Sequence, residues 1–174
     1  MRRALMTLLF GAALHPIALH AQQPAAPAPV PDQMPFDIPL GTSITAERAQ
    51  QLVAAVMAEA RKSPRNWKLA IAVVDPNGDL VYFYKMDQTQ IGSVQVAIGK
   101  ARTSARFRRT TQTYFDLMQT PAGAYVTTLD PTIIASPGGI PLVENGRLIG
   151  AIGCSGATGA QDAVACGVGA ALVR

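Results

Sequence analysis

The sequence predicts an α+β domain in which helices form a layer against an antiparallel sheet. Two pairs of apolar segments are joined by tight-turn sequences, Asp75-Pro76-Asn77-Gly78 and Asn145-Gly146. Proline presets the first corner of the former turn, and Asn-Gly favours a two-residue type I′ turn. Apolar residues at helical spacing lie before, between and after these hairpins. Antiparallel hairpins with helices between and after them are typical of a layered α+β domain.

The first half of the domain is predicted to be a helix followed by a hairpin. Residues 45–62 carry an apolar stripe at helical spacing, and Thr45 suits the N-cap. The strands of the hairpin are expected at 69–74 and 79–85. Both strands have apolar residues on both faces, which indicates a sheet that is covered on both sides or by another subunit.

The second half alternates helices and strands in the same way. We expect a helix capped by Ser93, a short helix, an irregular stretch from 119 to 136, a hairpin and a last helix. The elements expected there are a helix at 93–109, a helix at Thr111–Met118, a brief strand at Thr132–Ala135, strands at 140–143 and 148–152, and a helix at Ala160–Val173.

The strand sequence from Gly150 to Gly156 has small residues where a strand usually places bulk. Glycine in a strand marks close approach of a ligand, a chain or a helix. The last helix, Ala160–Val173, is also small and apolar, so we expect it to pack closely on this strand. At the rim, two pairs of residues could present backbone amides to an anion as a nest: Gly138, Gly139, Ser155 and Gly156. Tight turn geometry explains the same glycines equally well.

The N-terminus has the pattern of a secretory signal peptide. Arg2 and Arg3 precede an apolar run that is too short to span a membrane, and cleavage is expected after Ala21. A retained amphipathic anchor is the alternative. We therefore expect a signal peptide at 1–21, a Pro/Ala-rich extended leader at 22–42, a domain at 43–174, and a periplasmic or secreted protein.

Removal of the signal peptide changes the composition in two ways. Both histidines of the chain, His15 and His20, lie within it, so the mature protein has none. The 15 basic residues include two in the signal peptide, so 13 remain against 11 acidic ones and the net charge falls from +4 to +2. This charge does not predict nucleic-acid binding. The mature sequence contains no Ser-His-Asp set, no metal-binding motif and no dinucleotide-binding fingerprint.

Two cysteines, Cys154 and Cys166, occur in the mature chain. An even number in an exported protein favours a disulfide. Two buried small apolar residues, or a redox-sensing thiol pair, are the alternatives.

A set of short motifs resembles one known family. In order along the chain, these are Leu69-Ala70-Ile71-Ala72-Val73-Val74-Asp75, Met86-Asp87, Gly92-Ser93, Ala97-Ile98-Gly99-Lys100-Ala101-Arg102-Thr103, Pro137-Gly138-Gly139-Ile140-Pro141 and Gly150-Ala151-Ile152-Gly153-Cys154-Ser155-Gly156. Their order and spacing over about 45–173 resemble the GlcG/HbpS-like haem-binding family, also called the haem-degrading domain. The resemblance implies a profilin-like layered fold, with a five-stranded antiparallel sheet flanked by helices. It also implies homo-oligomers, from dimers to octamers.

The resemblance also implies haem as a cofactor and directs attention to the helix that holds Lys100. Thr103 resembles the family's proposed haem contact, and a neutral hydroxyl would hold iron weakly. Arg102 and Arg106 are one turn apart and could pair with the two propionates. Met86 is another candidate ligand, because ordinary histidine ligation is excluded in the mature chain.

Each of these residues also has a structural interpretation. Thr103 suits a buried hydroxyl bonded within its helix, and the arginines suit a solvated face or a subunit contact. Lys100 could be a base of lowered pKa, although a salt bridge to Asp87 or Asp162 is favoured. Asp162 is expected to cap the last helix.

Three functions remain open at this point. The first is an exported haem-binding protein that serves haem sensing, transport or degradation. The second is a binding module or enzyme for a small carboxylate or another metabolite, built on the amide nest, Lys100 and the arginines. The third is a non-catalytic oligomeric redox accessory that uses the two cysteines.

Overall fold

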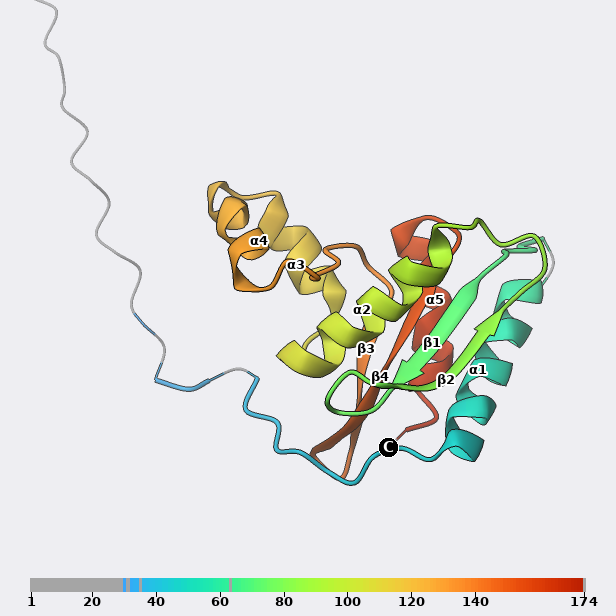
Figure 1. The fold of residues 1–174 in the computed structure, drawn as a ribbon, viewed down its shortest axis with the longest axis horizontal. Helices are drawn as coiled ribbons and strands as arrows, with labels where there is room; N and C mark the ends of the chain where they lie inside the picture. The colour runs from blue at the N-terminus through green and yellow to red at the C-terminus, as the bar shows by residue number, and fades with distance from the viewer. Residues whose placement is uncertain (1–29, 31, 35, 63, 174) are drawn as a thin grey trace, which may run out of the picture. The chain divides into compact units, whose positions relative to one another are not determined.

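The computed structural model describes residues 30, 32–34, 36–62 and 64–173 (Figure 1). The predicted signal peptide, 1–21, and residues 22–29, 31 and 35 of the predicted leader lie outside the described residues. Every described helix and strand belongs to the compact unit Met34–Arg174. None of these helices is long and apolar enough to cross a membrane.

The helices and strands follow the predicted order, with two short additions and without the brief strand expected at Thr132–Ala135. The additions are the 3₁₀ helix η1 and the single-turn helix α4. The elements are α1 (Ala46–Arg61), β1 (Ala70–Val74), β2 (Leu80–Lys85), α2 (Ser93–Phe107), α3 (Thr111–Met118), η1 (Pro121–Tyr125), α4 (Val126–Leu129), β3 (Gly139–Glu144), β4 (Arg147–Ser155) and α5 (Gly159–Ala170).

The strands form one antiparallel sheet in the order β2-β1-β4-β3. The two predicted hairpins are confirmed as β1–β2 and β3–β4. Their turns use positive φ angles where the sequence predicts them, at Gly78 (94°), Asn145 (49°) and Gly146 (73°). The central strands β1 and β4 are buried almost throughout, whereas β2 and β3 are edge strands.

The sheet has four strands, so the expected fifth strand is wrong. The segment Thr132–Ala135 pairs with no strand and packs on α2 instead. The backbone N–H of Ile134 donates to the Thr103 hydroxyl at 3.0 Å. Its side chain fills the space above Gly99, where a Cβ would lie 2.5 Å from Ile134 Cγ1. A contact with a helix side chain thus replaces the strand ladder that the alternating residues suggest.

Helices cover both faces of the sheet, as the apolar faces of its strands predict (Figure 1). On one face, α1 and α5 pack on the sheet through large side chains of the helices and strands, which include Leu52, Val56, Ile71 and Ile152. On the other face, α2 packs over a thin layer of small residues: Ala70, Ala72, Val74, Ala97, Ala101, Ala105 and Ala151. Alternate residues of β1 and β4 therefore serve two cores of different thickness.

The last helix packs on β4 as predicted, joined to it by Cys154 and Cys166, but glycines of both elements also make room for other helices. A Cβ on Gly153 would lie 2.6 Å from the Ala101 nitrogen of α2, so this glycine makes room for α2 and not for α5. On α5, a Cβ on Gly169 would lie 2.7 Å from Val56 Cγ2 of α1. The smallness of α5 therefore lets α1 approach it closely.

Of the three N-cap residues that the sequence predicts, one is confirmed and two are wrong. Thr45 caps α1 by accepting from the Arg48 N–H. Ser93 is the first residue of α2 and does not cap it. Thr158, and not Asp162, caps α5 and forms a capping box with Gln161. The Thr158–Gln161 pair satisfies the first amides of the helix, which leaves Asp162 free for a different partner.

Candidate functional site

A buried ion pair joins α2 to α5. Lys100 is 1% exposed and Asp162 is 2% exposed, and their Nζ and Oδ2 atoms are 2.8 Å apart. Lys100 also donates to the Cys154 carbonyl oxygen of β4 at 3.0 Å. The other carboxylate oxygen of Asp162 accepts from the Ala157 N–H at 3.0 Å. Of the two salt bridges predicted for Lys100, the structure forms the one with Asp162.

Burial acts on the two charges of this pair in opposite directions. It lowers the pKa of the Lys100 ammonium and raises the pKa of the Asp162 carboxyl, while the charge of each partner opposes the shift. Because the Lys100 ammonium donates to two acceptors and is closed off from solvent, it serves as a link between three elements of the fold. This arrangement does not support the alternative of a free base.

The predicted disulfide between Cys154 and Cys166 is present, with the two Cα atoms 5.7 Å apart. Both residues are fully buried in the core under α1 and α5. Cys166 follows Asp162 by one helical turn, so the disulfide attaches one turn of α5 to β4 and the ion pair attaches the neighbouring turn to α2. Together they fix the position of α5 on the sheet.

Two candidate haem ligands lie inside the protein. Thr103 is 2% exposed, and its hydroxyl accepts from the Ile134 N–H. Met86 is 3% exposed and belongs to the core cluster between the sheet and α1. Thr103 is therefore a buried hydroxyl that bonds within the protein, as its structural interpretation predicts. Its partner, however, is a neighbouring loop and not its own helix.

The two arginines predicted to meet propionates lie against the β1–β2 turn. The Nε–H of Arg102 donates to the Gly78 carbonyl at 3.0 Å, and that of Arg106 donates to the Asn77 carbonyl at 3.2 Å. Arg106 also lies 3.7 Å from Asp130. These bonds orient both guanidinium groups, and in the described part of the chain they use one N–H of each.

The predicted amide nest is brought together in part. Gly138 lies beside Cys154, whose N–H donates to the Gly138 carbonyl, and Gly138, Gly139 and Ser155 are buried. The Gly139 N–H donates to the Thr111 hydroxyl at 2.9 Å. Gly156 adopts a positive φ of 145° next to Lys68. Because the Gly139 amide is bonded internally, the arrangement does not favour the nest as an anion site.

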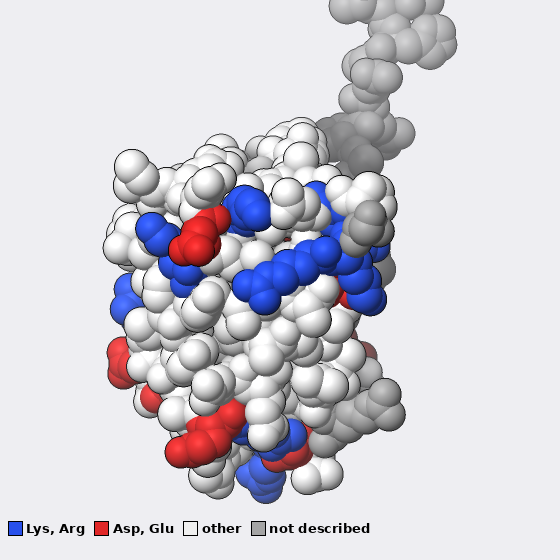
Figure 2. Space-filling view, turned by 90° about the vertical axis from the view of Figure 1, so that its right-hand side faces the viewer, with Lys and Arg blue, Asp and Glu red and all other residues white. Residues whose placement is uncertain are grey.

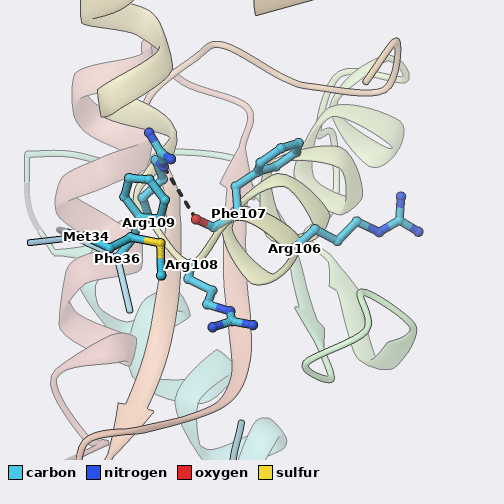
Figure 3. Close-up of a pocket in the computed structure, with 6 residues that line it drawn as sticks. All are labelled: Met34, Phe36, Arg106, Phe107, Arg108 and Arg109. Carbon is cyan, nitrogen blue, oxygen red and sulfur yellow. Dashed lines mark hydrogen bonds between the residues drawn. The ribbon is translucent and has the colours of Figure 1, made fainter. Parts of the chain in front are cut away.

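A pocket that the sequence analysis did not identify lies at the C-terminal end of α2 (Figure 3). It has a volume of about 280 Å³, and its lining comes from the leader, from the end of α2 and from the two residues that follow α2. The lining residues are Met34, Phe36, Arg106, Phe107, Arg108 and Arg109. The dense basic run 106–109 was the available signal, although nothing in the sequence places the leader beside it.

Among the residues that the structure describes, no group of three histidine, cysteine, aspartate or glutamate side chains is placed to hold a metal ion.

The fold and the buried network define a small α+β domain in which a helix-borne lysine bonds to the last strand and the last helix. The model of the family described as haem-degrading protein HbpS-like matches residues 44–171. This match covers well over half of the chain, and the chain therefore belongs to the HbpS-like family.

Individual relatives agree with this assignment. The chain is 37% identical to the protein GlcG of Escherichia coli K12 over 112 residues, which are 64% of this chain and 81% of GlcG. It superposes on a double mutant of Streptomyces reticuli HbpS with a TM-score of 0.69 and 25% identity, over 86% of this chain and 99% of that one. A structure of PduOC in complex with haem has the same fold, with a TM-score of 0.69 and 21% identity over 76% of this chain and 96% of that chain.

Proposed function

We propose that this protein is an exported haem-binding protein that serves haem sensing, transport or degradation. The observation that carries the proposal is the family match over residues 44–171. The fold shared with PduOC, whose structure contains haem, supports it. The signal-peptide pattern at 1–21 supports export to the periplasm or the medium.

The interior residues of this chain do not fit the role of axial haem ligands. Thr103, Met86 and Lys100 are each at most 3% exposed. The hydroxyl of Thr103 and the ammonium of Lys100 are already bonded within the protein. The mature sequence has no histidine. Haem that binds this protein is therefore held at the surface, and we derive no iron coordination from these three residues.

Arg102 and Arg106 fit the propionate side of such a haem. They are one helical turn apart, and the bonds of their Nε–H groups to the β1–β2 turn orient both side chains. Their terminal N–H groups suit paired hydrogen bonds to carboxylates. A flat ligand held mainly through its carboxylates would exchange readily, which suits a carrier or a sensor accessory.

We further propose that the protein forms a homo-oligomer. Strand β2 lies at the edge of the sheet, where Leu80 and Tyr84 are exposed. Figure 2 views the side on which α1 lies, and the middle of that face carries few charged side chains. Exposed apolar side chains on an open strand edge, beside a face with few charges, favour contact with another copy of the chain.

The test is a titration of the mature chain, without a histidine tag, with haemin, followed by absorbance. We expect a saturable Soret band. Because each charged hydrogen bond is worth about 1.5–3 kcal/mol, the double variant Arg102→Gln/Arg106→Gln should bind at least about tenfold more weakly. Arg61→Gln, which removes an exposed charge from α1, is the matched control.

A threonine pair separates a ligand role from a structural one. Thr103→Ser keeps the hydroxyl that bonds the Ile134 N–H, whereas Thr103→Ala removes it. We expect both variants to retain the Soret band, with Thr103→Ala less stable. The absence of any haem-dependent absorbance change in the unmodified chain would refute the proposed function.

A further inference from the structure

The pocket at the end of α2 combines an apolar wall with free cationic groups (Figure 3). The apolar wall comes from Met34 and Phe36, and the ring of Phe107, which also lines the pocket, points away from them in the close-up. In the close-up, Met34, Phe36 and Arg109 lie together, and the side chain of Arg106 points away from them. Arg109 is thus the cation against Phe36, and Arg108 lines the pocket on another side.

One wall of the pocket comes from the segment that precedes the family match. Met34 and Phe36 precede residue 44, where the family match begins. Their segment is held on the domain, because Arg108 Nη1 donates to the Ile38 carbonyl at 2.9 Å. The Leu148 N–H donates to the Pro39 carbonyl at 2.8 Å, and Leu40 forms a parallel bridge with Leu148. The predicted leader thus supplies part of a formed cavity.

The two cations have most of their hydrogen-bonding capacity free. Arg109 lies over the Phe36 ring, with 3.8 Å from the guanidinium carbon to the ring centroid. Its Nε–H donates to the Phe107 carbonyl at 3.4 Å. A guanidinium has five N–H donors, and the hydrogen bonds among the described residues use one on Arg108 and one on Arg109. No carboxylate in the described ranges forms a salt bridge with either residue.

The backbone at Arg108 supports a role for its side chain. This residue ends α2 with a φ of 54°, in the left-handed region. Glycine or asparagine usually occupies that position, because other residues meet a steric cost there. The chain places an arginine there, and its guanidinium connects the end of α2 to the leader. Non-glycine residues in this conformation are enriched at ligand sites.

We propose that this pocket binds a small organic anion that has a compact apolar group, held by Arg108 and Arg109 against Phe36. The volume of about 280 Å³ is at the lower end of ligand pockets, so the ligand is of the size of a substituted phenyl group. The shared chemistry is an anionic head with an apolar body, and the head is a carboxylate or a phosphate.

The test is a ¹H–¹⁵N correlation titration of the full chain with four probes. Phenylacetate and phenyl phosphate carry both features of the ligand, acetate carries the charge alone, and phenethyl alcohol carries the ring alone. We expect saturable shifts at 36–38 and 106–109 with phenylacetate, phenyl phosphate or both. Whichever of the two binds more tightly identifies the head group. Equal responses to all four probes, or no saturable shift with any of them, would overturn the proposal.

Three variants test the residues. Arg108→Asn removes the charge with a residue that tolerates the left-handed backbone. Arg109→Gln removes the second charge, and Phe36→Ala removes the apolar wall. Each should weaken binding about tenfold or more, whereas Arg61→Gln, on the opposite face of the sheet, should leave it unchanged. Unchanged binding in Arg108→Asn and Arg109→Gln would overturn the assignment.

This site does not depend on the proposed haem function. The probes are tested without haemin, and the variants leave Arg102 in place. A negative haemin titration therefore has no bearing on the pocket, and a negative probe titration has none on haem binding.

Discussion

Replacement of Lys100 by methionine should lower the free energy of unfolding by about 3–5 kcal/mol, because it leaves the buried carboxylate of Asp162 without its cation. At 2.8 Å, the attraction between the two charges is about 6 kcal/mol at an effective dielectric constant of 20. Burial of both charges offsets much of this attraction. The loss of one partner, however, leaves the other with its full desolvation cost.

The neutral pair should recover most of that loss. Asp162→Asn keeps an oxygen that can accept from the Ala157 N–H, and Lys100→Met/Asp162→Asn contains no buried charge. We expect the double variant to be more stable than Lys100→Met alone by more than 1 kcal/mol. The Cys154 carbonyl loses its bond to Lys100 in both variants, so the comparison isolates the charge.

The assay is denaturant unfolding of the four proteins with the disulfide intact, analysed as a double-mutant cycle. A control at a different buried position is unnecessary, because each single variant is the reference for the other. If the two single effects add to the double effect within about 0.5 kcal/mol, the ion pair is not a coupled unit and the argument fails.

Further predictions concern the packing of the same region. Reduction of the Cys154–Cys166 disulfide opens the loop that the bond closes in the unfolded chain. It should therefore lower the free energy of unfolding by about 3 kcal/mol, measured as a fall in the denaturant midpoint. Free thiols in the unreduced protein would contradict the bond. Gly153→Ala should destabilise by about 1–3 kcal/mol, because its Cβ would lie 2.6 Å from the Ala101 nitrogen. Gly167→Ala is the matched control on α5: nothing lies within 4 Å of its Cβ, so it should stabilise by about 0.5–1 kcal/mol. Equal effects of the two substitutions would refute the steric explanation.

Local chemistry accounts for the parts of the fold that were predicted correctly. Asn145-Gly146 and Asp75-Pro76-Asn77-Gly78 form their turns because their own backbone preferences select the geometry. Thr45 caps α1 through a bond to a residue three positions on. The wrong predictions concern segments whose partners are distant in the sequence. The stretch 132–135 alternates like a strand, yet its partner is the Thr103 hydroxyl on α2.

In the candidate sites, too, the contacts between distant segments could not be predicted from the sequence. The pairing of Lys100 with Asp162 was one of two predicted alternatives, and the choice between them depended on where α5 packs. The buried position of Thr103 depends on a loop that begins far along the chain. The pocket escaped prediction because Phe36 and Arg109 are distant in sequence, and no periodic pattern joins a proline-rich segment to a helix end.

By itself, the sequence determined the α+β class, the two hairpins, the four longer helices and the family, and it favoured the disulfide. Each of these depends on nearby residues or on the order of motifs. The tertiary structure alone decided that glycines of β4 and β3 make room for α2, that Asp162 neutralises Lys100, and that the leader meets Arg108 and Arg109. These contacts join segments brought together by packing, and packing depends on the shape of the whole core.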